Sequence, residues 1–169
     1  ATAFPWLSVR ECFVGIAPAT VMGVSFSGEL AYEIHVPNAS LYAAYKALRK
    51  AGEAHGLKLF GARAVESMRM EKGFLHWKAD LITERDPSET GLARFVNTAK
   101  DTFIGKDALL KERETGSKKA FVTMTVDAPF ADAPYMSTVW NGDEVVGETT
   151  SGDWGFRVNK SIALGVVKA

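Results

Sequence analysis

The residues best suited to chemistry lie between Phe26 and Glu33, a segment that reads Phe-Ser-Gly-Glu-Leu-Ala-Tyr-Glu. Alternating apolar residues flank a small turn around Gly28, which predicts a β-hairpin with Glu33 in the middle of its second strand. Glutamate is depleted in strands and costly to bury without a partner, so a mid-strand carboxylate needs a reason. It could accept two adjacent N–H donors of a flat ligand. The alternative is a solvent-facing side chain on an open sheet.

Side-chain alternation divides this second strand between two faces. Glu33 shares its face with His35 and with Ala31, whose small side chain leaves room above the carboxylate. Tyr32 lies on the opposite face, together with Ile34, and this position favours packing in the core.

The other reactive residue types form no pattern typical of a site. The three histidines are far apart and have no Cys or acidic residue at ligand spacing, so no metal site is expected. No motif around the single cysteine, Cys12, would activate its thiol, and we expect it in the core. No glycine-rich loop has nucleotide-binding spacing and no Ser-His-Asp arrangement can be argued. The motifs alone therefore predict no catalysis.

Composition sets outer limits on function. The 169 residues suffice for one large or two small domains, and 47% hydrophobic with 24% charged residues is ordinary for a soluble protein. Twenty basic residues balance 20 acidic ones, which gives no electrostatic case for binding nucleic acid or an anionic membrane. No segment approaches transmembrane length or resembles a signal peptide, and the chain starts without Met. We therefore expect part of a longer protein in a reducing compartment, the cytoplasm.

The hairpin is expected within a mixture of strands and helices. Glycines (Gly56, Gly73 and Gly116) follow each predicted helix and mark its end. A further strand is predicted over residues 92–96, after an Asp86-Pro87 turn. The predicted elements are strands over 9–16, 20–27 and 31–36, and helices over 39–55, 62–72 and 106–114.

The composition changes after residue 116. Residues 118–126 alternate in polarity, Asn141-Gly142 is a type I′ hairpin signal, and residues 162–167 read as a last strand. Gly152 and Gly155 are interpreted as turn glycines. The fold expected is α+β, with a hairpin-and-helix domain over residues 1–116 and a small antiparallel β-barrel over residues 117–169.

Several segments resemble one family in the same order. The hairpin is similar to the Y-T-G-E-x-G-Y-E signature of the glycine cleavage T-protein family of aminomethyltransferases. Residues 69–73, 86–92 and 103–109 resemble its R-L-E-K/A-G, T-P-x-E-x-G-L and F-I-G-K/R-E-A-L segments, and residues 150–165 resemble its C-terminal barrel. The opening residues and Glu66–Arg69 resemble the branch that is fused behind FAD-dependent dimethylglycine or sarcosine dehydrogenases. The resemblance covers this chain but only the C-terminal half of the family's module.

The resemblance implies tetrahydrofolate chemistry. In such a fusion a flavin domain oxidises an N-methyl group of an amine, and this module captures the one-carbon unit on tetrahydrofolate as 5,10-methylenetetrahydrofolate. The resemblance implies that Glu33 accepts hydrogen bonds from the pterin N3–H and 2-amino groups and that Phe26 lines the folate site. Tyr32 is the third candidate cofactor-binding residue. FAD is expected only in an upstream domain.

Three departures from the family pattern limit this assignment. Val65 stands where the family has a folate-contacting arginine, and Ala31 replaces the usual glycine. The acidic residue that the family uses in methylene transfer lies in the N-terminal half, so no catalytic residue is assigned here. Arg69 and Glu71 are interpreted as structural charges at a helix end.

The expected function is a tetrahydrofolate-binding segment of a demethylating one-carbon transferase, active in the full protein and inactive as this fragment. Its expected partners are folate, an N-methylated amine and the N-terminal remainder of the polypeptide. A non-catalytic folate-binding or assembly module is the alternative, and a domain that only positions a partner subunit is a third. Phe74 follows Lys72-Gly73 where the family's iron–sulfur assembly branch has a Cys, which argues against that branch.

Overall fold

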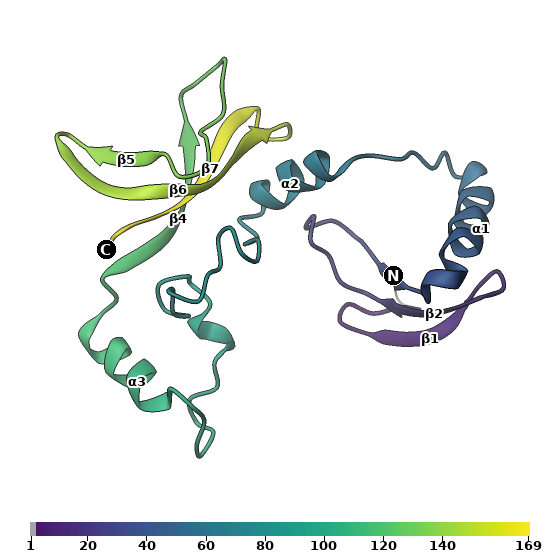
Figure 1. Ribbon diagram of the computed structural model, residues 1–169, viewed down its shortest axis with the longest axis horizontal. Helices are drawn as coiled ribbons and strands as arrows, with labels where there is room; N and C mark the ends of the chain where they lie inside the picture. Colours follow the sequence, from purple (N-terminus) through teal and green to yellow (C-terminus); the bar gives the residue numbers. More distant parts are fainter. Residues whose placement is uncertain (1–2) are drawn as a thin grey trace. The chain divides into compact units, whose positions relative to one another are not determined.

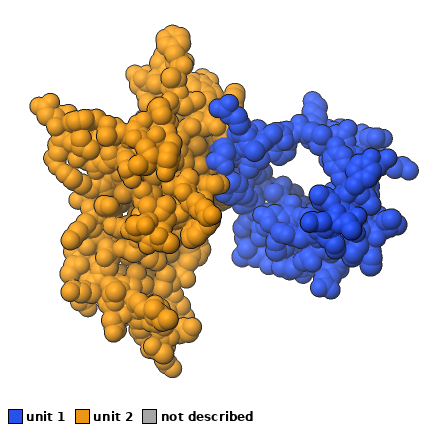
Figure 2. Space-filling view, viewed as in Figure 1, with its two compact units in different colours: residues 1–66 blue, residues 67–169 orange. Residues whose placement is uncertain are grey.

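A computed structural model describes residues 3–169 of the chain, which divide into two compact units after residue 66. Figure 1 labels the elements, and Figure 2 colours the two units separately. The α+β class expected from the sequence is confirmed. The predicted division at residue 116 remains a prediction.

The first unit is a three-stranded antiparallel sheet with one helix. The sheet order is β1-β2-β3, and a tight turn at Gly15, whose φ is 63°, joins the first two strands. The elements are β1 (Val9–Val14), β2 (Ala17–Met22), β3 (Glu33–His35), the 3-10 turn η1 (Asn38–Ser40) and α1 (Leu41–Glu53).

Small side chains hold this unit together. Among its described residues, the buried hydrophobic ones are all alanines: Ala17 and Ala19 on β2 and Ala44 on α1. A Cβ added at Gly15 would lie 3.0 Å from the Cβ of Ala47, so the β1–β2 turn approaches the helix closely. Large apolar side chains such as Phe13 remain exposed. The unit therefore buries little apolar surface of its own.

The second unit contains α2, α3 and a four-stranded sheet. Its core consists of Met70, Ile162 and Leu164, with Leu75 and Phe121 packed against them. All strand pairs are antiparallel, in the order β4-β7-β6-β5. The elements are α2 (Ala62–Glu71, which begins before the unit boundary), the 3-10 turn η2 (Ala93–Phe95), α3 (Lys106–Thr115), β4 (Lys119–Val126), β5 (Thr138–Asn141), β6 (Glu144–Gly155) and β7 (Lys160–Lys168).

The small antiparallel β-barrel expected over residues 117–169 is an antiparallel sheet that is not closed. In the described residues β4 and β5 are the two edges of an open sheet and do not pair with each other. Alternating polarity indicates that strands have one buried face, but closure also depends on tilt and register, which alternation does not encode.

The three helices are confirmed to within two residues at each end. The glycines that follow them adopt positive φ, 64° at Gly73 and 81° at Gly116, a conformation that other residues rarely tolerate. None of the described helices is both long enough and apolar enough to cross a membrane.

A strand was predicted over residues 92–96, but the 3-10 turn η2 lies there instead. The amides of Phe95 and Val96 donate to the carbonyls of Leu92 and Ala93 within the turn. Arg113 of α3 donates to the Ala93 carbonyl at 3.0 Å. These local partners replace the ladder that a strand would need.

The β5–β6 hairpin is present, but its turn differs from the predicted type. Asn141 pairs with Glu144 as the last strand pair, so Gly142 and Asp143 are the central residues of the turn. Only Gly142 of these two has positive φ, at 59°. A glycine at the first central position is typical of a type II′ turn, whereas type I′ requires positive φ at both positions.

Candidate functional site

The segment from Phe26 to Glu33 is mostly a loop. Strand β2 ends at Met22 and β3 begins at Glu33, so the predicted strand through Phe26 is wrong. Gly28 has φ of 76°, and weak bonds of 3.4 Å join Ser27 to its neighbours Ser25 and Glu29. Polar side chains here satisfy the backbone locally and compete with strand pairing.

Glu33 is therefore the first residue of a short strand and not a mid-strand residue. It pairs with Met22 of β2, and its side chain is 51% exposed. His35 lies on the same face, as alternation predicted, with Nε2 3.2 Å from Glu33 Oε2. An ionised carboxylate offers about four acceptor positions, so Glu33 keeps capacity for a second, bidentate partner.

The two aromatic candidates lie beside this strand. Phe26 is half-buried in the loop. Tyr32 is 42% exposed, so the expectation that it packs in the core is wrong. Its ring makes an edge-to-face contact with Phe4, with centroids 5.2 Å apart, and the Arg10 guanidinium lies 5.1 Å from the centroid of the Phe4 ring. Tyr32 therefore belongs to a surface aromatic group.

The sheet face that carries Glu33 is open and mixed in character. Glu11 of β1, Thr20 of β2 and His35 of β3 form one row across the three strands. A shallow depression of about 490 Å³ includes these residues and the exposed ring of Phe13. Cys12 also borders it and is exposed, not the core thiol expected from the sequence. Most side chains of the edge strand β1 are exposed.

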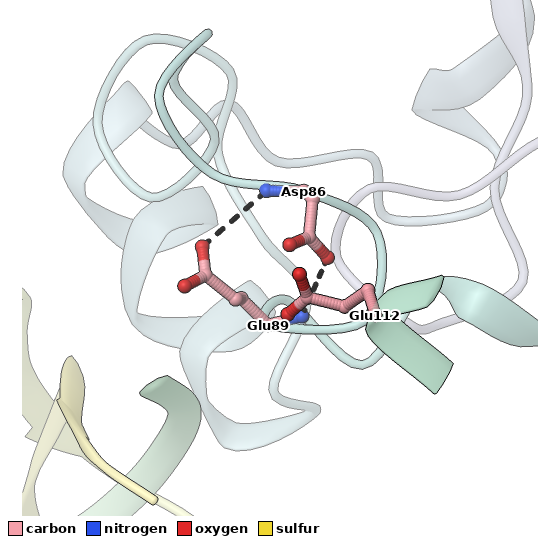
Figure 3. A group of neighbouring side chains, drawn as sticks. All are labelled: Asp86, Glu89 and Glu112. Carbon is pink, nitrogen blue, oxygen red and sulfur yellow. Dashed lines mark hydrogen bonds between the residues drawn. The ribbon is translucent and has the colours of Figure 1, made fainter. Parts of the chain in front are cut away.

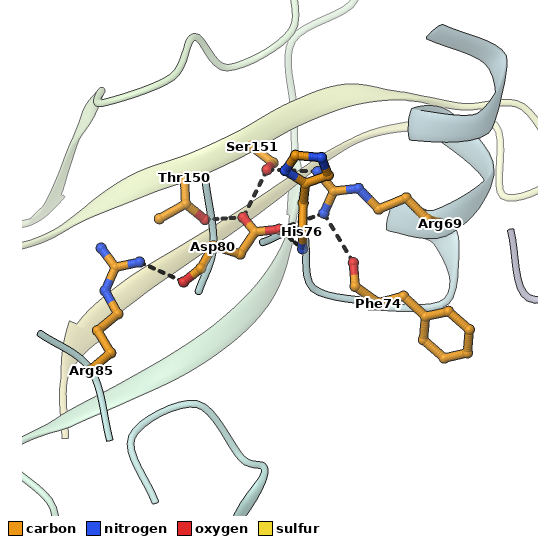
Figure 4. A network of polar contacts seen from close by, with 7 residues as sticks. All are labelled: Arg69, Phe74, His76, Asp80, Arg85, Thr150 and Ser151. Atoms are coloured by element: carbon orange, nitrogen blue, oxygen red, sulfur yellow. Dashed lines mark hydrogen bonds and ion pairs between the residues drawn. The ribbon is translucent and has the colours of Figure 1, made fainter. Parts of the chain in front are cut away.

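The second unit contains a buried polar network that sequence reasoning missed (Figure 4). Asp80 is fully buried, and the guanidinium of Arg69, 2% exposed, donates to Oδ2 at 2.6 Å. The His76 amide also donates to Oδ2, at 2.8 Å, while Thr150 and Ser151 donate to Oδ1 at 2.5 and 2.7 Å. Four donors fill the acceptor capacity of this carboxylate. Asp80 therefore has no position left for a substrate proton.

The network connects helix, loop and sheet. Arg69 also donates to the Phe74 carbonyl and to Ser151 Oγ. Arg85 donates to the Asp80 carbonyl at 2.7 Å and to Glu148 on β6 at 3.0 Å. Thr150 and Ser151, which donate to Asp80, follow it by 70 residues or more, and no local motif marks such a contact. Only the pairing of distant segments could have revealed it.

The structural interpretation of Arg69 and Glu71 agrees with these contacts. Glu71 accepts the backbone amides of Arg157 and Val158, at 2.6 and 3.3 Å, in the turn between β6 and β7. Both charges at the end of α2 therefore bind the protein's own sheet. Val65, at the position of the family's arginine, is half-buried on the same helix.

Three carboxylates of the second unit lie together and form an acidic group (Figure 3). Oxygens of Asp86, Glu89 and Glu112 all lie within 4.8 Å of one another. Asp86 accepts the amides of Ser88 and Glu89 at 2.6 and 3.0 Å, and Glu89 reaches back to the Asp86 amide at 3.4 Å. This reciprocal pattern is a capping box on a single turn that ends at Gly91. The capping box therefore explains the positions of Asp86 and Glu89.

Two protein-family models match this chain. The family model for the GCVT N-terminal domain matches residues 1–100, and that for the glycine cleavage T-protein C-terminal barrel domain matches residues 119–169. Human mitochondrial sarcosine dehydrogenase is 38% identical over 169 residues, 98% of this chain and 18% of that protein. Human mitochondrial dimethylglycine dehydrogenase is 33% identical over 165 residues, 97% of this chain and 19% of that protein.

A solved structure shares the fold. The crystal structure of glycine cleavage system aminomethyltransferase T from Bartonella henselae matches 99% of this chain and 46% of its own, with a TM-score of 0.82 and 21% identity. The chain thus spans less than a fifth of each dehydrogenase and about half of this aminomethyltransferase.

The expected cytoplasmic location is wrong on this comparison, because the dehydrogenases that the chain matches are mitochondrial proteins. A balanced net charge and a single cysteine do not distinguish a mitochondrial protein from a cytoplasmic one, so the composition could not predict the compartment. The resemblance to the T-protein module and to its dehydrogenase-fused branch is confirmed. By two family models that together match most of its length, the chain belongs to the glycine cleavage T-protein family.

Proposed function

We propose that this chain is the tetrahydrofolate-binding segment of an aminomethyltransferase-like enzyme of the dimethylglycine or sarcosine dehydrogenase type. The observation that carries the proposal is the Glu33 carboxylate, which lies on an open sheet face with acceptor capacity beyond its contact to His35. The two relatives above are named as sarcosine and dimethylglycine dehydrogenases, which supports an N-methylated amine as substrate of the full protein.

The residues present fit one side of a pterin. A carboxylate accepts the adjacent N3–H and 2-amino groups in bidentate fashion, and an aromatic ring such as Phe26 packs against a flat heterocycle. Tyr32 lies next to Glu33 in sequence and offers a hydroxyl beside an apolar ring. Tetrahydrofolate, when bound, supplies the nitrogens that accept the one-carbon unit.

The exposure of Glu33 bears on how strong such binding can be. In water the carboxylate exchanges one set of hydrogen bonds for another, whereas in a closed site each charge-assisted bond contributes about 1.5–3 kcal/mol. Because the Glu33 side chain is 51% exposed, its hydrogen bonds to a ligand would reach this strength only if another part of the protein covered it. We therefore propose that tight folate binding and methylene transfer require the full-length protein, including an acidic residue and an FAD domain outside these 169 residues.

Calorimetric titration of the full-length protein with tetrahydrofolate tests the proposal. Glu33→Gln keeps the size of the side chain but replaces one acceptor oxygen with a donor amide, so affinity should fall about 10- to 100-fold. Glu114→Gln, an exposed change on α3, is the matched control and should leave the affinity unchanged. No measurable binding to the unmodified protein, or equal affinity with Glu33→Gln, would exclude the proposed site.

Turnover separates the enzyme from a non-catalytic folate-binding module. With a methylated amine and tetrahydrofolate, the full-length enzyme should form 5,10-methylenetetrahydrofolate. Folate binding without this product would favour the non-catalytic alternative.

A further inference from the structure

The second unit contains an apolar cavity that the proposed folate site does not use. Its volume is about 400 Å³, and it lies between the segment from Asp86 to Val96 and the start of α3. Phe103 and Leu109 line it, and Leu109, 8% exposed, is the buried part of its wall. Ile104 also borders the cavity, although its side chain is fully exposed to solvent. Such an apolar surface is costly to leave in water.

One side of the cavity is negatively charged. Asp86 and Glu112 line it, and the oxygens of Asp86, Glu89 and Glu112 lie within 4.8 Å of one another. Figure 3 shows Glu112 of α3 directed toward the other two acids. In the described part of the chain, the salt bridges join none of the three to a lysine, arginine or histidine. Three like charges at this separation repel one another until a cation approaches.

An apolar cavity beside unneutralised carboxylates matches one kind of side chain particularly well. Lysine and arginine have an aliphatic stem that packs on apolar surface and a cationic head that binds carboxylates. A divalent cation would contact the acids but leave the rings and methyl groups around Phe103 and Ile104 uncovered. The combination therefore favours a protein segment over an ion.

The length of the relatives supports a source of this segment within the same polypeptide. The aminomethyltransferase of the same fold has more than twice as much chain, since its matched part is 46% of the whole. The two dehydrogenase relatives are longer still. We propose that the cavity is an intramolecular docking site for an apolar segment with a lysine or arginine, supplied by the same polypeptide outside these 169 residues. The cation binds the Asp86–Glu89–Glu112 group, and apolar neighbours of that cation cover Phe103 and Ile104.

Photo-crosslinking of the full-length protein tests this docking site. Benzoylphenylalanine is placed at position 104 instead of isoleucine, and the irradiated, digested protein is analysed by mass spectrometry. The expected result is a cross-link within one polypeptide, to a peptide outside residues 1–169 with a lysine or arginine within about four residues of the linked position, one helical turn. A cross-link between two copies, a link only to residues 1–169, or no link overturns the proposal.

A charge reversal tests the role of the acids. Glu112→Lys in the same labelled protein should lower the cross-link yield at least fivefold, and Glu114→Lys, exposed on the same helix, should retain it. An unchanged yield with Glu112→Lys would contradict the role of the carboxylates. Dependence of the yield on added Mg²⁺ or Ca²⁺, with loss in EDTA, would identify a metal site instead. Glu33→Gln should leave the yield unchanged, so failure of the folate proposal and failure of this one are distinguishable.

Discussion

The Arg69 guanidinium donates to the Asp80 carboxylate over 2.6 Å while both side chains are almost completely shielded from water. A buried ion pair is retained only when its geometry is good and its remaining hydrogen-bonding groups have partners. Here Thr150, Ser151 and the His76 amide occupy the rest of the carboxylate. The pair therefore fixes the loop after α2 to strand β6.

Replacing Asp80 by asparagine should destabilise the second unit by about 3–5 kcal/mol, because the buried Arg69 guanidinium would lose the negative charge that it now contacts. Native-state hydrogen exchange of the β6 and β7 amides in the full-length protein measures this free energy of opening. Asp143→Asn, in the exposed β5–β6 turn, is the matched control and should cost little. A similar, small effect for both variants would mean that the ion pair contributes no stability.

A second prediction concerns Gly152, which was interpreted as a turn residue but lies inside β6 and pairs with Ala163. A Cβ at this position would lie 2.0 Å from the Ala133 carbonyl oxygen, so backbone would have to move. Gly152→Ala should therefore destabilise the protein by more than about 2 kcal/mol in urea unfolding. Gly61→Ala, with open space around its Cβ, serves as the control. Equal midpoints for the two variants would contradict the close approach.

The third prediction concerns Glu144 and Lys168, which form an exposed ion pair between β6 and β7. The hydrogen bond from Lys168, followed by its positive charge, lowers the pKa of Glu144 below its ordinary value of 4.5. A lowered pKa means that the pair stabilises the fold above pH 4.5 and that this contribution is lost as pH falls through the lowered pKa. Lys168→Met should return the pKa of Glu144 toward 4.5, as followed by NMR of its carboxyl carbon. Lys160→Met, on the same strand, should not change it.

Local patterns predicted much of the fold. Helix ends followed the glycines, because Gly73 and Gly116 adopt positive φ that other residues rarely tolerate. In the second unit alternation predicted β4, whereas β7 is buried at consecutive positions and β6 contains Gly152, which was expected in a turn. The errors arose where hydrogen bonds, and not the periodicity of the side chains, determine the backbone conformation. Phe26 lies in a loop whose serines form local hydrogen bonds. Residues 92–96 form hydrogen bonds within their own turn and with Arg113.

The candidate site was predictable only in part. The side chains of Glu33 and His35 lie on one face, as the two-residue period requires. The exposure of Tyr32 was not predictable, because its ring contacts Phe4, which lies well before it in the chain. Asp80 was missed for the same reason on a larger scale, since its partners on β6 are 70 or more residues away.

The alanine core of the first unit has a calorimetric consequence. The heat-capacity increment of unfolding scales with the apolar surface that unfolding exposes, and alanines bury little of it. Ala17, Ala19 and Ala44 are the buried hydrophobic residues in the described part of that unit, so its separate unfolding would raise the heat capacity little. In a scanning experiment on the full-length protein, residues 1–66 should have no peak of their own and should melt together with whatever chain covers them.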